Sequence, residues 1–270
     1  MENETPLQKH NREVLRTSQM KLLTILEAID SICRRCDISY WLDGGTLLGA
    51  VRHGGFIPWD DDVDIAMTVE DLRRFVEVAP NLLGDNLALQ TPDTPGVKEL
   101  IYKVRDKDSL LIENGEEVHF DGLHGMFVDI FPFIDYPDVS ISFVKKYGHG
   151  VSKSYSILHH THRYSLRSVA ELPWFSLKYF YYKALWKAAS LLKPMGKYVG
   201  NTLINNGYGI MHRRDSVFPL TEVQFEGKTF SAPCNPDAYL RDLYGDYSVL
   251  PPENRRKSHA VILIPSLTGQ

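Results

Sequence analysis

The first part of the chain carries apolar residues at the spacing of an amphipathic helix. Leu22, Leu26 and Ile29 follow one another at intervals of four and three, which predicts a helix over Leu7–Cys36. A short run of aromatic and branched residues after this helix predicts a strand over Ile38–Leu42.

Glycines then break the pattern, and strands and helices follow further along. Asp43-Gly44-Gly45-Thr46 interrupts the strand, and we expect a short helix just after the glycines, over Leu47–Val51. The pattern next predicts a strand over Val63–Met67, a helix over Glu70–Pro80, and strands over Leu87–Gln90, Glu99–Arg105, Ser109–Ile112 and Met126–Phe131. Pro132 and Pro137 then close this first half of the chain. Helices are expected after that, then strands within Ser216–Phe230 and a short helix over Pro236–Leu243.

This order of elements, without an internal repeat or a flexible linker, predicts one α+β domain over residues 1–270. We expect a mixed sheet flanked by helices, interrupted by a basic helical insertion at about 139–215.

Composition places the chain among ordinary globular proteins. Of 270 residues, 43% are apolar and 24% are charged, which excludes disordered and collagen-like classes. The N-terminal residues are polar, no run of apolar residues is long enough to span a bilayer, and three cysteines are too few for a disulfide framework. We therefore expect a soluble, cytoplasmic protein.

The net charge of −4 conceals an uneven distribution. Residues 139–215 hold twelve basic residues against Glu171 and Asp215, a net charge of +10, so the remaining residues, with eighteen basic and thirty-two acidic, carry −14. Aromatic residues crowd the stretch Leu172–Leu192 and alternate with lysines, which fits an element resting peripherally at the inner membrane face. The alternative is that the aromatic residues are core and the lysines a solvated rim. Binding of nucleic acid is a weaker interpretation than these two, because the rest of the chain is acidic and no nucleic-acid-binding motif occurs.

The clearest chemical signal is a pair of carboxylates two residues apart. Asp62 and Asp64 are two residues apart at the start of the predicted strand Val63–Met67, so their side chains point to one face. Two adjacent carboxylates repel each other unless a cation neutralises them, and oxygen ligands of this kind suit Mg²⁺ or Mn²⁺. Two aspartates at this spacing, taken alone, are more often a surface feature, so the neighbouring sequence decides whether they bind a metal.

That context is the glycine turn upstream. Gly44, Gly45 and Thr46 lie between a strand and the start of a helix, where backbone N–H groups approach and bind phosphate. A phosphate cradle followed by a metal-binding pair on the next strand predicts phosphoryl or nucleotidyl transfer.

The same stretch closely resembles the LicD family, a branch of the nucleotidyltransferase-fold superfamily that includes the fukutin-related proteins. The resemblance lies in WLDGGTLLGAVRH (41–53) and GFIPWDDDVDIAM (55–67), and more weakly in VDIFPFID (128–135) and residues 239–259. It implies a nucleotidyltransferase-like fold in which Asp62 and Asp64 bind the metal with Asp60 close by.

The superfamily commonly completes its site with a third carboxylate on a neighbouring strand, and Asp129 is the candidate here. Asp129 lies within an apolar strand, so it is a metal ligand, a general base for the acceptor hydroxyl, or the partner of a buried arginine. Lys103 and Arg105 share one face of a predicted strand and are candidates to neutralise the donor diphosphate, with surface solvation as the alternative. Arg52, after the short helix, is a candidate to face the substrate phosphate as a catalytic residue.

The resemblance implies transfer of phosphocholine from a CDP-alcohol, with CDP-choline favoured, to a hydroxyl of a glycan such as a teichoic acid or lipopolysaccharide precursor, free or lipid-linked, with release of CMP. Choline requires aromatic walls, and Trp41, Trp59, Tyr102 and Tyr244 are candidates. Two alternatives stay open: a nucleotidyltransferase that places NMP on a small molecule, and a non-catalytic membrane or nucleic-acid binding protein.

Overall fold

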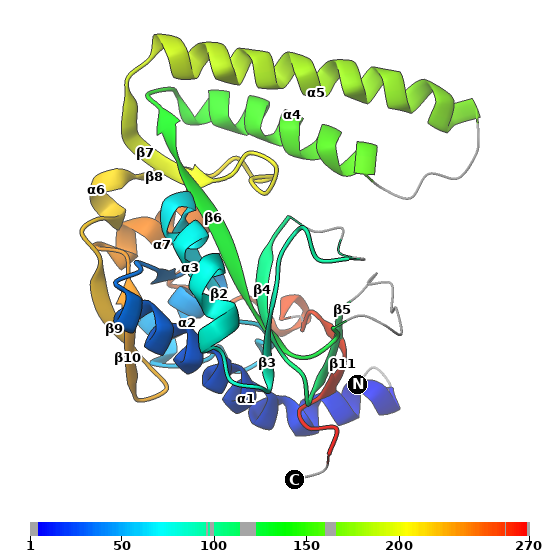
Figure 1. Cartoon of the computed structure of the whole chain (residues 1–270), viewed down its shortest axis with the longest axis vertical. Coiled ribbons are helices and arrows are strands. Elements are labelled where there is room, and N and C mark those ends of the chain that lie inside the picture. The colour runs from blue at the N-terminus through cyan, green and yellow to red at the C-terminus, as the bar shows by residue number, and fades with distance from the viewer. Residues whose placement is uncertain are drawn as a thin grey trace.

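A mixed, twisted sheet runs through the middle of the molecule (Figure 1). The computed structural model describes residues 5–95, 97, 100–113, 123–159, 166–256 and 258–268. The sheet has the central order β1-β2-β6-β4-β3, and β7 and β8 extend it along β6. Its strands are β1 (Trp41–Leu42), β2 (Asp64–Thr68), β3 (Leu87–Gln90), β4 (Tyr102–Asp106), β6 (Phe127–Pro137), β7 (Met195–Asn201) and β8 (His212–Arg213). Only β2 and β6 run parallel among these described pairs.

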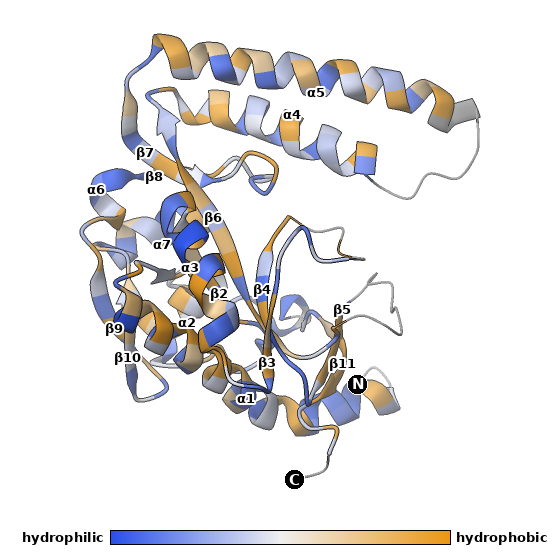
Figure 2. Ribbon diagram, viewed as in Figure 1, coloured by the Kyte–Doolittle hydropathy of each residue, from blue (hydrophilic) through white to orange (hydrophobic). Residues whose placement is uncertain are grey.

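Helices pack against this sheet, which confirms the predicted α+β class. The helices are α1 (Pro6–Cys36), α2 (Gly44–His53), α3 (Val69–Leu82), α4 (Ile141–His159), α5 (Leu166–Leu192), α6 (Arg214–Val217), α7 (Pro236–Tyr244) and the short 3-10 helix Glu253–Arg255. The main core lies where α1 and α3 meet β2, β4 and β6, and Leu26, Ile29 and Ile65 are fully buried in it. Figure 2 shows apolar residues concentrated on these inward surfaces.

The first helix agrees with its prediction almost residue for residue. Thr5 and Gln8 form a reciprocal capping box, in which each side chain accepts a hydrogen bond from the backbone N–H of the other residue. Asp37 ends the helix in the left-handed conformation with a φ of 53°. The predicted strand after this helix is shorter than expected, because only Trp41 and Leu42 pair with β2.

The sixth strand is longer than the sequence predicts, and the expectation that it ends at Phe131 was wrong. β6 stops pairing with β4 at Ile130 and begins pairing with β7 at Phe133. Pro132 falls between these two partners, where its missing N–H removes no ladder hydrogen bond, while its carbonyl accepts from Thr202 N–H at 2.9 Å. The first residue of the predicted strand Glu99–Arg105 lies outside the described residues; β4 begins at Tyr102.

The basic insertion begins with a helical hairpin that stands on the far end of β6 (Figure 1). α4 and α5 pack on each other, and a small second core of Tyr136, Val144 and Trp186 joins them to the sheet. Tyr136 and Trp186 meet edge to face with ring centroids 4.8 Å apart. Helices therefore fill the first part of residues 139–215, while β7 and β8 return to the sheet in the last part.

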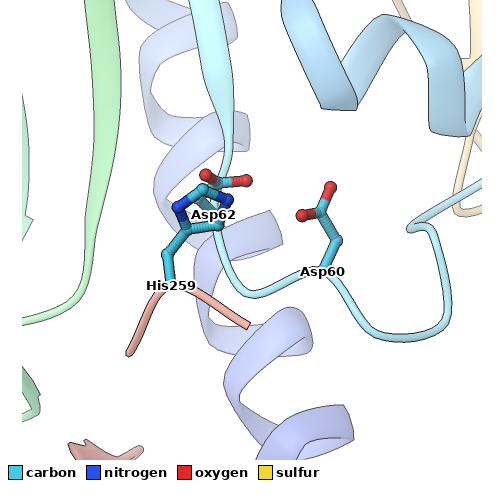
Figure 3. A group of neighbouring side chains, drawn as sticks. All are labelled: Asp60, Asp62 and His259. Atoms are coloured by element: carbon cyan, nitrogen blue, oxygen red, sulfur yellow. The ribbon is translucent and has the colours of Figure 1, made fainter. Parts of the chain in front are cut away.

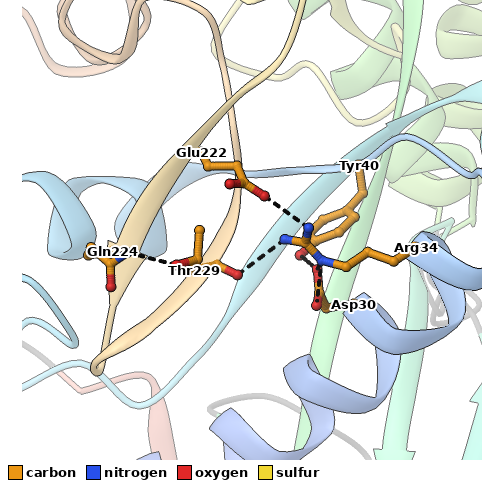
Figure 4. Close-up of polar contacts among 6 residues, drawn as sticks. All are labelled: Asp30, Arg34, Tyr40, Glu222, Gln224 and Thr229. Carbon is orange, nitrogen blue, oxygen red and sulfur yellow. Dashed lines mark hydrogen bonds and ion pairs between the residues drawn. The ribbon is translucent and has the colours of Figure 1, made fainter.

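Two small sheets complete the fold. The hairpin of β9 (Thr221–Phe225) and β10 (Lys228–Ala232) replaces the longer strand region expected over Ser216–Phe230, whose first residues belong to α6. Arg34 of α1 holds this hairpin by donating to Glu222 at 2.9 Å and to the Thr229 carbonyl at 3.2 Å (Figure 4). The other sheet pairs β5 (Leu110–Glu113) with β11 (Ala260–Ile264), so the C-terminal segment returns beside α1.

No helix among the described residues is long and apolar enough to cross a membrane.

Candidate active site

The parallel pairing of β2 with β6 brings two acidic residues to one end of the sheet. Asp64, the first residue of β2, lies opposite Asp129 of β6 in the register, and the Asp129 N–H donates to the Val63 carbonyl at 2.9 Å. Asp62 lies just before β2 rather than within it. Two carboxylates far apart in sequence thus become neighbours because their strands are adjacent.

The glycine turn is tied to the start of β2 on both sides. The Asp43 N–H donates to the Asp64 carbonyl at 3.0 Å, and the Asp64 N–H donates to the Thr46 hydroxyl at 2.9 Å. Asp43 also caps α2 by accepting from the Gly44 N–H at 2.7 Å, so α2 begins at Gly44 and not at Leu47 as predicted. The two glycines therefore form the first turn of the helix.

These glycines are required by close contact with carboxylates. A Cβ on Gly44 would lie 2.7 Å from Asp64 Oδ2, and a Cβ on Gly45 would lie 2.8 Å from Asp60 Oδ2. Gly44 also has a φ of +51°, in the left-handed region that favours glycine. The positive end of the α2 dipole thus lies against the acidic cluster, where it stabilises negative charge.

A histidine from the far end of the chain joins the acidic run. Asp60, Asp62 and His259 each present a ligand atom, and these three atoms lie within 4.8 Å of one another. Figure 3 shows the three side chains pointing toward one another from the loop before β2 and from the segment before β11. Two carboxylates and one imidazole form a donor set that fits a divalent cation such as Mn²⁺ and leaves room for other ligands.

Asp61 lies between these two aspartates in sequence but has a different task. Its carboxylate accepts from the Ser258 hydroxyl at 2.5 Å, from the His259 N–H at 3.0 Å and from the Ala260 N–H at 2.7 Å. The side chain is 1% exposed. Asp61 therefore fixes the C-terminal segment in the position that brings the His259 imidazole to the other two aspartates.

Crowding of like charges dominates the electrostatics of the cluster. Burial, and then the charge of Asp61, raise the pKa of Asp60 to about 6. The pKa values of Asp62 and Asp64 are also raised well above the ordinary range, first by burial and then by the neighbouring carboxylates. The carboxylates can therefore stay close together only when a bound cation neutralises them or when some of them are protonated.

Asp129 has a buried cation beside it. Lys103 Nζ lies 3.2 Å from Asp129 Oδ1 and 3.7 Å from Glu113 Oε2, and the lysine is 2% exposed. The ammonium also lies 3.6 Å from the centroid of the Phe127 ring. Asp129 therefore has a buried cation as its partner, but this is Lys103 and not the arginine considered above. Its role as metal ligand or base stays a prediction.

The two predicted arginines lie outside the group formed by Asp60, Asp62 and His259. Arg105 is 3% exposed and donates to Gln90 Oε1 at 2.7 Å and to the Gly125 carbonyl at 2.9 Å. Surface solvation of Lys103 and Arg105, the alternative considered above, is therefore wrong. Arg52 donates from Nη1 to the Tyr247 carbonyl at 3.2 Å, which ties α2 to the loop after α7. Phosphate binding by either arginine stays a prediction.

The aromatic candidates for a choline-binding wall differ in how exposed they are to solvent. Trp41 is fully buried and packs edge to face on Phe133 and Phe218, so it cannot line an accessible site. Tyr244 is 47% exposed, and burial and then the charges of Asp64 and Asp43 raise its pKa, so its hydroxyl lies within the electrostatic field of the acidic cluster.

Sequence reasoning did not assign Tyr239 to the site, and for His259 it left open whether the residue shapes the pocket or only packs a lid. Tyr239 of α7 donates to Asp43 Oδ1 at 2.8 Å and stacks on His212 at 3.7 Å, so it supports the residue that caps α2. His259 belongs to the C-terminal block of the family resemblance, which was the one available signal. Only the fold, through Asp61, shows where its ring lies.

Comparisons with known proteins bear on the family of the chain. A family model described as LicD/FKTN/FKRP, nucleotidyltransferase domain, matches residues 37–173. Lipopolysaccharide cholinephosphotransferase LicD of Haemophilus influenzae is 28% identical over 264 residues, which cover 92% of this chain and 96% of that protein. Ribitol 5-phosphate transferase FKRP of Homo sapiens is 45% identical over 58 residues, but these cover only 22% of this chain and 10% of that protein.

Gly45→Ala tests the close contact between the glycine turn and the carboxylates. The added Cβ would lie 2.8 Å from Asp60 Oδ2, so the carboxylate must move, and we expect Mn²⁺ affinity to fall by about tenfold or more. Isothermal titration calorimetry measures the affinity. Gly84→Ala is the control, because its Cβ would have nothing within 4 Å. Equal affinities for the two variants would contradict this account of the turn.

The raised carboxylate pKa values predict how stability changes with pH. In the unfolded chain Asp60 titrates near its ordinary value of 3.8, whereas in the folded chain its pKa is about 6. The folded state therefore binds this proton more tightly, and its contribution to stability is full below pH 3.8 and is lost as the pH rises through about 6. A divalent cation binds the ionised carboxylates, so added Mn²⁺ is expected to raise the melting temperature more near neutral pH than at about pH 5.

Differential scanning fluorimetry with and without Mn²⁺ measures this dependence. Asp62→Asn removes one of the crowded charges, so this variant should show a weaker pH dependence without metal and a smaller Mn²⁺ effect. Asp138→Asn, which removes an exposed partner of Lys197, is the matched control. An Mn²⁺ effect of the same size at both pH values would count against the site.

Proposed function

The chain belongs to the LicD family, and on that premise we propose that it is a divalent-cation-dependent transferase that moves phosphocholine from CDP-choline to a glycan hydroxyl. The observation that carries the proposal is the convergence of Asp60, Asp62 and His259 beside the glycine turn. The similarity to the cholinephosphotransferase LicD extends over most of both chains, which supports phosphocholine over ribitol phosphate as the transferred group.

The donor diphosphate would bind beside the acidic cluster, next to the start of α2. Asp60, Asp62 and His259 would hold Mg²⁺ or Mn²⁺, and Asp64 and Asp129 are the further candidate ligands. When bound, the cation supplies positive charge that neutralises the oxygens of the diphosphate. The first turn of α2, with Gly44, Gly45 and Thr46, adds the positive end of a helix dipole for the same phosphates.

The acceptor hydroxyl is oriented from the other side of the cluster. Asp129 lies one strand away from Asp64, and Lys103 keeps its charge partly neutralised at 3.2 Å. Asp129 accepts the hydroxyl proton as the hydroxyl oxygen forms a bond to the distal phosphorus. The bond from that phosphorus to the bridging oxygen breaks, and CMP leaves with the bonding electrons. Catalysis then rests mainly on positioning and electrostatics.

The choline group requires an aromatic surface that remains accessible. Tyr244 meets this requirement, because it is 47% exposed and close to Asp64 and Asp43. Trp59 is a second candidate, although Arg256 already covers its ring at 4.6 Å. Arg52, which is joined to the loop after Tyr244, would approach the donor from the same side.

The acceptor is proposed to be a cell-surface glycan such as a lipopolysaccharide or teichoic acid precursor. The Haemophilus influenzae relative carries lipopolysaccharide in its name, which supports this class of acceptor.

Turnover by Asp62→Asn tests the proposal. Loss of one carboxylate from the cluster is expected to lower CMP release from CDP-choline by about a hundredfold or more, with a glycan acceptor and Mn²⁺ present. Phosphorus NMR detects CMP and the new phosphodiester together. His259→Ala should also lower turnover, whereas Asp138→Asn and the exposed His159→Ala should retain it.

The same assay distinguishes the competing functions. If CDP-ribitol or CDP-glycerol is a better substrate than CDP-choline, the assignment of the donor changes but the class of reaction stays the same. Pyrophosphate released from a nucleoside triphosphate would instead indicate nucleotidyl transfer. Turnover that is unchanged in Asp62→Asn would contradict the proposal.

A further inference from the structure

The outer side of α5 carries apolar residues that no described part of the chain covers. Val169, Leu177, Phe180 and Leu191 are 70%, 66%, 68% and 76% exposed. Together with the exposed Pro173 and Ala184, these residues are spaced four, four, three, four and seven positions apart in sequence order. This spacing places all six in one row along the helix. We call this row the α5 stripe. Trp174, Tyr181 and Leu192, which are 56%, 56% and 81% exposed, form a second row beside it.

The opposite side of α5 already has its partners. Trp186 is buried against Tyr136, and Tyr182 lies so close to α4 that a Cβ on Gly150 would be 2.6 Å from its ring. Tyr147 and Tyr182 also meet, with ring centroids 5.9 Å apart. The α5 stripe is therefore a second apolar side of the same helix and not an imperfectly buried core.

Charge around the stripe is positive. Residues 141–159 and 169–192 contain six lysines, no arginine and a single acidic residue, Glu171. Lys183 and Lys187 are exposed and follow Phe180 by three and seven residues, so Lys183 lies beside the stripe and Lys187 lies on it. Lys178 lies 4.8 Å from the Trp174 ring centroid. Apolar and aromatic residues bordered by lysines are the composition of helices that lie in a membrane interface.

The position of α5 leaves this side accessible to a flat surface. α5 is the outermost element of the hairpin, and α4 lies between it and the sheet (Figure 1). Figure 2 shows hydrophobic positions along its length. A second copy of the chain is a poorer occupant, because two copies would bring the same basic surface, with Glu171 as its single acidic residue in 141–159 and 169–192, against itself.

We propose that the α5 stripe docks the protein on the surface of an anionic lipid bilayer. The apolar rows enter the boundary between headgroups and acyl chains, and Lys183 and Lys187 contact the anionic headgroups. Because the helix lies in the plane of the interface, this docking requires no membrane-spanning segment.

Vesicle flotation of the full chain tests the proposal. Vesicles of phosphatidylcholine with about 30% phosphatidylglycerol are expected to carry the protein, and vesicles of phosphatidylcholine alone much less of it. The double variant Leu177→Ser with Phe180→Ser should bind the anionic vesicles at least about tenfold more weakly. Lys183→Gln with Lys187→Gln should weaken the same binding by about tenfold and reduce its dependence on salt.

Leu267→Ser is the matched control, because Leu267 is 57% exposed but lies in the C-terminal segment away from the hairpin. It should float like the unaltered protein, and thermal melting should show all variants folded. Failure of the unaltered protein to float, equal binding to both kinds of vesicle, or an equal loss in Leu267→Ser would overturn the proposal. A dimer in light scattering that the double stripe variant dissociates would overturn it too, because the occupant would then be a second copy.

Discussion

Mutual repulsion among partly buried carboxylates is the constraint on which the candidate site depends. Asp60, Asp62 and Asp64 lie together at the start of β2, and their raised pKa values express the cost of charging them side by side. Hydrophobic packing alone would separate such groups. The fold keeps them together by fixing the backbone around them, and it places the N-terminal end of α2 where the dipole reduces the repulsion.

Three parts of the chain contribute to this fixation. The glycine turn is joined to β2 through Asp43 and Thr46, so α2 cannot move away from Asp64 without breaking backbone hydrogen bonds. β6 brings Asp129 and its partner Lys103 to the same end of the sheet. Asp61 holds the C-terminal segment through three hydrogen bonds and so completes the donor set with His259. The site therefore forms only once segments as far apart in the sequence as Asp43 and His259 have come together.

The sequence was sufficient for those parts of the site that are close together along the chain. The glycines and Asp62 and Asp64 were identified from spacing and family resemblance, and the α+β class and the long first helix followed from apolar periodicity. The rest depends on pairings that no local pattern specifies. β6 passes through Pro132 because its neighbour changes from β4 to β7 there. Lys103 lies in the interior because a carboxylate on the next strand neutralises it, and His259 reaches the site only through Asp61.

Direct observation of the bound cation tests the central claim. Crystals grown with Mn²⁺ and collected near the manganese absorption edge would give an anomalous difference map in which a single peak identifies the ion. The account predicts a peak between the carboxylates of Asp60 and Asp62 and the His259 imidazole, beside the first turn of α2. A peak elsewhere on the chain, or none at this position with Mn²⁺ in excess, would contradict it.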